Sequence, residues 1–213
     1  MISQIEQAEL IADLGLAEAF SYEEFTSAAG INGNFKINLP EALDRDKILS
    51  EKFVGHIAAS LSGVEAIVAT GGAVSIANNV SAETGLPMVK LVKNLNGRLQ
   101  TSNASGHDTL AKRPRVGFLE DVTSTRKTTE RAINQLRIRD LVDVVVTGWR
   151  RGEPCPENMT QEEVDIYNKS FAFRRLYEVP TNLPLVSVIE RKMPLWIPTE
   201  KMIHARLPEI SSL

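Results

Sequence analysis

One segment, residues 116–131 with the sequence VGFLEDVTSTRKTTER, constrains the fold most strongly. It opens with an apolar run of the length expected for a buried strand, continues with two carboxylates, and passes through a polar turn into a helical pattern. In an open α/β sheet, ligands bind at the carboxyl ends of the strands, where the following helix offers free N–H groups to an anion. The segment therefore predicts an α/β fold with a Rossmann-like, mostly parallel sheet flanked by helices.

The polar side chains of this segment suit a sugar phosphate. The turn combines hydroxyl groups with positive charge, as an anion site requires; its residues are Thr123, Ser124, Thr125, Arg126, Lys127 and Thr128. The carboxylates before it, Glu120 and Asp121, suit vicinal hydroxyls or a hard cation such as Mg²⁺. A strand, a polar loop and a capped helix of any α/β protein would give the same pattern, and that alternative stays open.

A second strand, turn and helix occur earlier in the chain. The apolar run 64–69 leads into Thr70, Gly71 and Gly72, and a helix is predicted over 73–84. Glycines allow a ligand to approach the backbone closely, and the helix N-terminus supplies amides. Many α/β turns share this arrangement, so it supports a phosphate site only in combination with the first segment.

The rest of the chain predicts one domain over residues 1–213. Residues 93–112 have no periodic apolar pattern and predict a functional or disordered loop. Around Gly30, Asn32 and Gly33, turn residues predict a hairpin between two short extended pieces. Further strands are predicted at 86–92, 141–147 and 183–189, and helices at 2–19, 41–61, 160–176 and 198–207.

Composition excludes some classes of partner. Of the 213 residues, 43% are hydrophobic and 24% charged, and the net charge of −3 gives no sign of a nucleic-acid or membrane partner. The single cysteine, Cys155, excludes an intrachain disulfide framework. No basic, apolar leader pattern and no apolar run of about 18 residues occurs, so we expect a cytoplasmic protein.

Taken in order, these features resemble the type I phosphoribosyltransferases over residues 20–150, and the orotate phosphoribosyltransferases most. The stretch 25–38 is similar to that family's N-terminal hood hairpin and matches it at Phe25, Thr26, Gly30 and Asn38. The resemblance implies that fold, with hood elements in residues 1–40 and the core in 41–213. Ala28 stands where the family has a basic residue, and Arg126 with Lys127 stands where it has small residues.

The resemblance also implies an activity. The enzyme would transfer ribose 5-phosphate from phosphoribosyl pyrophosphate (PRPP) to a pyrimidine-like base, with release of pyrophosphate. A homodimer is implied, with Mg²⁺ bound mainly through PRPP and no metal ligand set of its own. The alternatives are a non-catalytic protein that binds PRPP or a nucleotide on the same fold, and an unrelated α/β protein.

The implied residue roles fall into three groups. Glu120 and Asp121, with Lys93 from a mobile lid over the pyrophosphate, are expected to act in catalysis. Phe35, Lys36 and Arg150 would contact the base, and Arg151 is the alternative to Arg150. PRPP would be bound by the two turns, at Thr70, Gly71, Gly72, Thr123, Ser124, Thr125, Arg126, Lys127 and Thr128.

Overall fold

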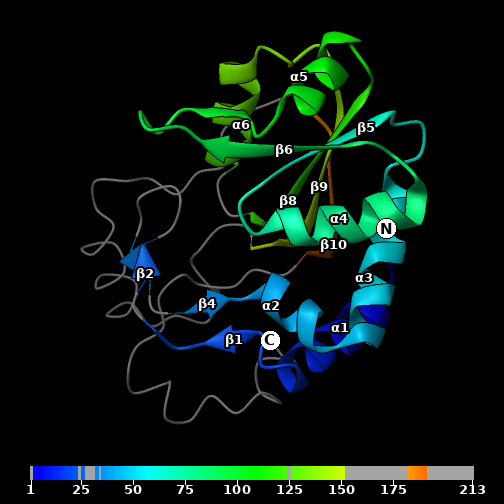
Figure 1. Cartoon of the computed structure of the whole chain (residues 1–213). Coiled ribbons are helices and arrows are strands. Elements are labelled where there is room, and N and C mark those ends of the chain that lie inside the picture. Colours follow the sequence, from blue (N-terminus) through cyan, green and yellow to red (C-terminus); the bar gives the residue numbers. More distant parts are fainter. Residues whose placement is uncertain are drawn as a thin grey trace.

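A six-stranded sheet forms the centre of the computed structural model (Figure 1). The strand order is β10-β9-β8-β5-β6-β7, and every neighbouring pair is parallel except β6 and β7. The model describes residues 2–23, 25–26, 32–33, 35–123, 126–151 and 182–190. The strands are β5 Ala66–Thr70, β6 Met88–Lys93, β7 Leu99–Thr101, β8 Val116–Thr123, β9 Val142–Arg150 and β10 Leu185–Glu190.

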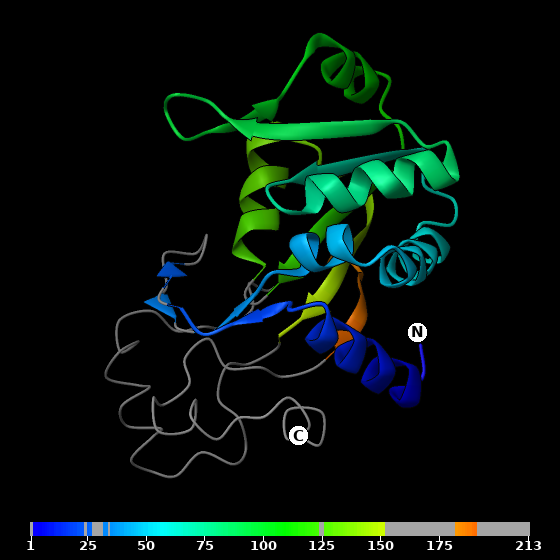
Figure 2. The same ribbon diagram turned by 60° about the horizontal axis from the view of Figure 1, so that its bottom comes forward.

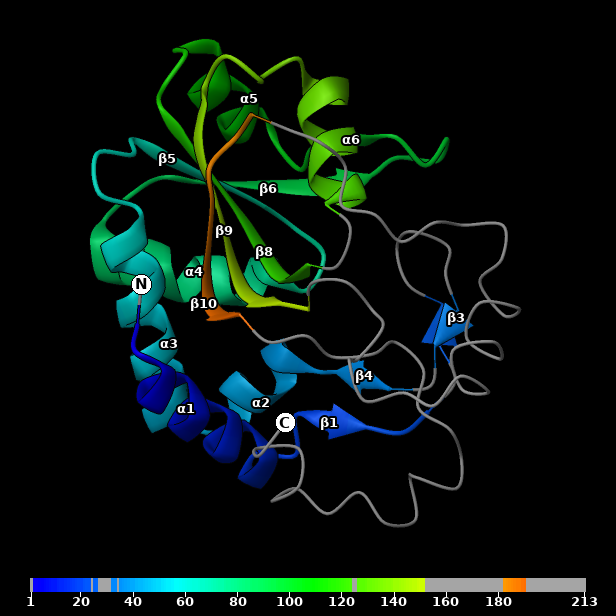
Figure 3. The ribbon, with the colours of Figure 1, turned by 180° about the vertical axis from the view of Figure 1, so that it is seen from behind.

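Helices cover both faces of this sheet, as the sequence predicts. Residues of α1–α4 form one apolar core with one face, and residues of α5 and α6 pack into a second core on the other. Figures 1 and 3, which view the molecule from opposite sides, show α4 and α6 on opposite faces. The helices are α1 Gln4–Leu16, α2 Leu39–Arg45, α3 Lys47–Ser60, α4 Ala73–Thr84, α5 Ala104–Ala111 and α6 Lys127–Leu136.

Local signals in the sequence set several helix ends. Ser3 and Glu6 form a reciprocal capping box at the start of α1. Gly85 ends α4 in the left-handed conformation, with φ of 72°. The N–H of Glu190 at the end of β10 donates to Gln7 Oε1 (3.0 Å), so α1 is fastened to the outermost strand of the sheet.

The hood contains two short antiparallel pairs below the sheet (Figure 2). β2 (Phe25–Thr26) pairs with β3 (Asn32–Gly33), so the predicted hairpin is present, but Asn32 and Gly33 lie in its second strand and not in its turn. β1 (Phe20–Ser21), which the sequence does not predict, pairs with β4 (Lys36–Ile37). β4 then leads into α2 of the core.

Two sequence-based expectations are wrong in detail. The apolar stripe 41–61 is divided between α2 and α3, because Asp46 is extended and its side chain accepts from Leu49 N–H as the N-cap of α3. The predicted loop 93–112 contains β7 and α5. Asn103 caps α5 by accepting a hydrogen bond from Gly106 N–H (2.8 Å). This capping residue marks the start of a helix that has no regular spacing of apolar residues. The predicted helices 160–176 and 198–207, and Cys155, lie outside the described residues.

Two glycines provide a matched test of this packing. A Cβ built at Gly148 would contact Leu39 and would lie 2.9 Å from the backbone oxygen of Asp121, whereas one at Gly55 in α3 would meet nothing within 4 Å. We expect Gly148→Ala to lower the free energy of unfolding by about 1–3 kcal/mol through overpacking. Gly55→Ala should leave it unchanged or raise it by about 0.5–1 kcal/mol, since alanine favours a helix. Denaturant unfolding measures both, and equal stabilities would contradict the packing.

Candidate active site

The carboxyl ends of three parallel strands bring the polar segments together. Ala69 of β5 is in register with Leu119 of β8, so the turn that follows β5 lies beside the acidic pair. On the other side of β8, Glu120 is in register with Thr147 and Thr123 with Arg150. The sheet therefore brings the turn after β5 and the end of β8 to the same side, next to the end of β9.

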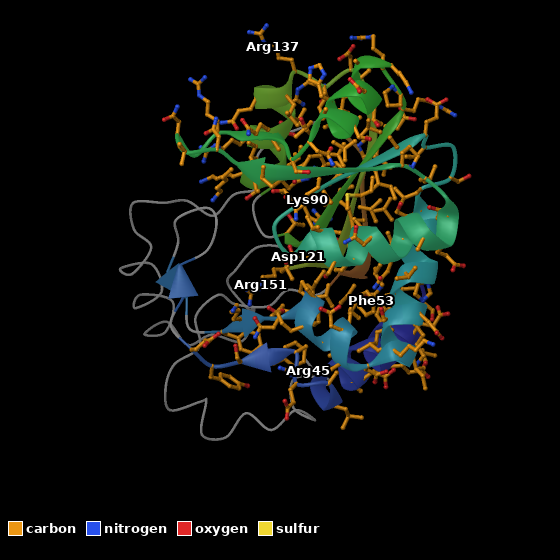
Figure 4. All side chains as sticks on the ribbon, viewed as in Figure 1. Arg45, Phe53, Lys90, Asp121, Arg137 and Arg151 are labelled. Carbon is orange, nitrogen blue, oxygen red and sulfur yellow. The ribbon has the colours of Figure 1, made fainter. Side chains whose placement is uncertain are left out.

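The glycine turn after β5 lies directly against an acidic side chain. A Cβ built at Gly72 would contact the carboxylate of Asp121 and would lie 3.1 Å from both its Cγ and the Cγ of Pro40. Gly71 has φ of 60°, in the region that favours glycine. Figure 4 shows Asp121 beside the ribbon of α4, which begins at this turn. No larger residue fits at position 72 without displacing Asp121.

The two predicted acidic residues lie within β8 and point to opposite faces of the sheet. Side chains along a strand point alternately to the two faces of the sheet. Glu120 therefore points to the same face as Val116 and Phe118, which belong to the core beneath α6. Asp121 has the parity of Leu119, which belongs to the other core. The strand was expected to end at this pair, but it continues to Thr123, so both carboxylates lie inside it. Only Asp121 lies against the glycine turn, and Glu120 is buried at 7% exposure.

Burial raises the pKa of both carboxyl groups. For Glu120 the hydroxyls of Thr129 and Thr123 counteract burial, Asp121 adds to the rise, and Arg126 lowers the pKa slightly. Both hydroxyls are buried, and they lie close enough to the Glu120 carboxylate to favour its charged form. For Asp121, burial is opposed by the N–H groups of Val122 and of Asp121 itself, and Glu41 raises the pKa further.

The phosphate turn differs from expectation at Arg126. This residue has φ of 59° at the start of α6, in the left-handed region that costs a non-glycine residue about 1 kcal/mol. Its guanidinium is mostly buried, and Nη2 donates to the carbonyl oxygen of Leu183 (3.1 Å). This contact holds the guanidinium against the chain just before β10. Lys127 is exposed and Thr128 half-buried in the first turn of α6, whereas Ser124 and Thr125 lie outside the described residues.

Two arginines, Arg150 at the end of β9 and Arg151 directly after it, have different partners among the described residues. Arg150 Nη1 pairs with Glu190 Oε1 of β10 (2.7 Å). Arg151 Nη2 donates to the carbonyl oxygen of Phe35 (2.7 Å), and its guanidinium carbon lies 5.7 Å from the centre of the Phe35 ring. Figure 4 shows Arg151 between the sheet and β4.

The other predicted base-side residues have structural partners. Phe35 is fully buried and stacks on Phe20 with ring centres 5.8 Å apart, so it is part of the core rather than a free contact surface. Lys36 Nζ pairs with Glu23 Oε1 (3.3 Å). The sequence reasoning missed Tyr22, whose ring centre lies 5.3 Å from that of Phe35, and Trp149, which packs edge-on against Phe20. The clustering of aromatics in residues 20–35 was the available signal.

Lys93 lies at the same edge of the sheet. It is the last residue of β6, is exposed, and stands two positions beyond Leu91, which is in register with Thr70. Its backbone is therefore level with the glycine turn.

Among the described residues, no group of three His, Cys, Asp or Glu side chains could hold a metal ion. Within that same part of the chain, no helix is long and apolar enough to cross a membrane.

Comparison with known proteins finds similar sequences and similar folds. No family model matches the chain. It is 28% identical over 173 residues to an orotate phosphoribosyltransferase of Methanosarcina acetivorans, covering 76% of this chain and 88% of that protein. The crystal structure of orotate phosphoribosyltransferase from Aeropyrum pernix aligns with a TM-score of 0.54 and 16% identity, over 85% of this chain and 93% of that one.

A larger protein shares the same architecture. The structure of Leishmania donovani UMP synthase aligns with a TM-score of 0.58 and 18% identity over 96% of this chain, which spans only 38% of that protein's length. The chain has the type I phosphoribosyltransferase fold. The predicted resemblance and fold class are confirmed, and the named relatives support the predicted enzyme class, a phosphoribosyltransferase.

The raised pKa values give a pH-dependent test of the acidic pair. A carboxyl group whose pKa is higher in the folded state binds its proton more tightly there, so stability falls as the pH rises from the ordinary values of 3.8 and 4.5 through the raised values. We expect Glu120→Gln with Asp121→Asn to flatten this decline and to keep or raise the melting temperature at neutral pH. If the pair acts on PRPP, turnover should be lost in the same variant.

The opposite result identifies a structural role. If the carboxylates mainly neutralise the cationic turn, the double variant should melt at lower temperature at neutral pH and bind phosphate more tightly. Thermal melting across the pH range, together with phosphate titration, distinguishes the two roles on a single protein.

Proposed function

We propose that this chain is a phosphoribosyltransferase of the orotate type, which transfers ribose 5-phosphate from PRPP to a pyrimidine-like base and releases pyrophosphate. One observation carries the proposal: the carboxylate of Asp121 lies against Gly72, beside the turn that leads into α6. A carboxylate between two helix N-termini suits a ribose that carries a phosphate group at each end. The sequence relatives named as orotate phosphoribosyltransferases support the same assignment.

The proposed roles follow from position. The amides at the start of α6, with Lys127 and Thr128, would hold the 5′-phosphate, together with Thr123, Ser124 and Thr125. Thr70, Gly71 and Gly72 would hold the pyrophosphate through backbone N–H groups, and Lys93 would offset its growing charge as the bond to the sugar breaks. Asp121 would orient the ribose hydroxyls. Glu120 would hold the phosphate turn in place from the core side, through Thr123 and Thr129.

Mg²⁺ fits this site as a companion of the ligand. A single half-buried carboxylate beside the glycine turn provides too few oxygen ligands for a dedicated Mg²⁺ site, but it suits an ion held mainly by phosphate oxygens. When bound, the ion would neutralise the leaving pyrophosphate. The residues of the chain would fix the geometry of the reacting groups, which is a major source of rate acceleration.

The base side favours Arg151 over Arg150. Arg151 connects the end of β9 to Phe35 of the hood, whereas Arg150 pairs with Glu190 at the sheet edge. An arginine beside aromatic rings can bind a flat, acidic base by charge and stacking. Phe35 would support that arginine from the core, and Lys36 would have to leave Glu23 to reach a base. A cytoplasmic homodimer completes the proposal.

A non-catalytic protein that binds PRPP or a nucleotide is the second candidate. The inward-facing Arg126 and the fully buried Phe35 favour it, because both differ from the ligand contacts expected of an enzyme of this family. Isothermal titration with PRPP and Mg²⁺ tests binding, and pyrophosphate release in the presence of orotate, uracil or adenine tests turnover. Turnover with orotate supports the enzyme and binding without turnover supports the second candidate. Absence of binding excludes both.

A single hydroxyl tests the phosphate turn. We expect Thr128→Val to weaken ribose 5-phosphate binding by about tenfold, because it removes a hydrogen bond to a charged group while preserving shape. Thr109→Val in α5 is the matched control, because the Thr109 hydroxyl donates to the Ser105 carbonyl within its own helix (2.8 Å) and belongs to neither phosphate turn. Equal affinity in both variants, measured by titration, would rule out this phosphate site.

A further inference from the structure

The hairpin of β6 and β7 is fastened to α6, the helix that begins at the phosphate turn. Leu99 N–H in β7 donates to Gln135 Oε1 (2.9 Å), and Arg131 Nη2 donates to the Gly97 carbonyl in the hairpin turn (3.0 Å). Arg131 and Gln135 are four residues apart and therefore lie on the same face of α6. The side chain of Leu99 is also buried in the core beneath this helix. Figure 3 shows the hairpin extending beside α6.

The hairpin turn is internally stiff. Asn94 Oδ1 accepts from the N–H groups of Asn96 (3.0 Å) and Arg98 (2.9 Å), and Asn94 N–H donates to the Arg98 carbonyl (2.8 Å). Gly97 has φ of 70° and closes the turn through its N–H to the Asn94 carbonyl (2.9 Å). Because these bonds connect the two arms, fixing Gly97 to α6 also fixes Lys93, the residue immediately before Asn94.

This arrangement sets the place of Lys93 relative to both phosphate turns. Along β6, Lys93 points to the same face of the sheet as Val89 and Leu91, which is the face that α6 covers. Its backbone is level with the glycine turn after β5. The opposite end of the connection is the start of α6, where the phosphate turn lies. One helix thus joins the predicted 5′-phosphate site to the lysine predicted for the pyrophosphate.

We propose that Gln135 and Arg131 are positioning residues that hold the hairpin so that Lys93 faces the pyrophosphate end of a ligand with two separated phosphate groups. The inference rests on the proposed function and adds to it the element that sets the spacing between the two phosphate sites. It differs from the expected mobile lid in one respect, because two hydrogen bonds connect the hairpin to α6.

Amide exchange tests the anchor without any ligand. Gln135→Met removes the acceptor of Leu99 N–H at similar size, and Arg131→Met removes the donor to Gly97. We expect the double variant to exchange the Leu99 amide about tenfold faster, because that N–H loses its acceptor, and the Gly97 amide faster as well, because the turn is released from α6. Gln100→Met on β7 and Arg137→Met after α6 change the same side-chain types at exposed positions and should leave that exchange unchanged.

Ligand titration tests the positioning role. Inorganic pyrophosphate with Mg²⁺ should bind the Gln135→Met, Arg131→Met variant about fivefold more weakly, with a similar rise in KM for PRPP. Ribose 5-phosphate, which needs only the phosphate turn, should bind unchanged. Gln135→Glu keeps an acceptor oxygen and Arg131→Lys keeps a donor, so that pair should restore most of the pyrophosphate affinity.

The outcomes separate this inference from the proposed function. Unchanged amide exchange, or faster exchange with unchanged pyrophosphate affinity, would overturn the positioning role alone. Equal losses of pyrophosphate and ribose 5-phosphate affinity would overturn it as well, since they would indicate general loosening of α6. If the unaltered protein binds neither pyrophosphate nor PRPP, the proposed function fails and the ligand role of the anchor fails with it.

Discussion

The close packing around Asp121 is the constraint on which the site depends. Gly72, from the turn after β5, lies against its carboxylate, and Gly148 of β9 lies against its backbone oxygen. Leu39 and Pro40, which open α2, pack against the same two glycines, Leu39 at Gly148 and Pro40 at Gly72. Three elements therefore meet at one strand residue, and two of them can do so only because they lack a Cβ at the point of contact.

The second acidic residue illustrates a different physical balance. Glu120 points into the core beneath α6, where burial disfavours its charge and the nearby Thr123 and Thr129 hydroxyls offset only part of that cost. A carboxylate held in this way stabilises the fold poorly. Its position beside Thr123 and Arg126 fits a role in ordering the turn between β8 and α6, and the pH profile of stability tests that role.

Much of the fold could be predicted because its signals are local and periodic. The apolar runs located all five parallel strands, and Gly85 located the end of α4. The hairpin and helix in residues 93–112 escaped prediction because their stability comes from side-chain caps such as Asn103 and from contacts with α6. These interactions join residues far apart in the sequence or replace apolar periodicity with single hydrogen bonds.

The site was predictable in its parts but not in its orientations. The strand carrying Glu120 and Asp121 was identified, yet its length, which extends to Thr123, decides that the two carboxylates face opposite ways. Likewise, the sequence could not choose between Arg150 and Arg151, because one residue of strand register determines which of them reaches Phe35. Strand register depends on how all the strands of the sheet pair, so the sequence of one segment cannot predict it.

The fastening of Glu190 to Gln7 has a consequence for behaviour in concentrated solution. Open sheets can recruit further strands from other molecules at their outer edges, which is a common route to aggregation. In the described part of the chain, one outer strand, β10, has its last N–H occupied by α1, and the other, β7, has only three residues. Among the described residues, the short β7 and the occupied end of β10 therefore reduce the number of backbone groups that a strand from another molecule could pair with.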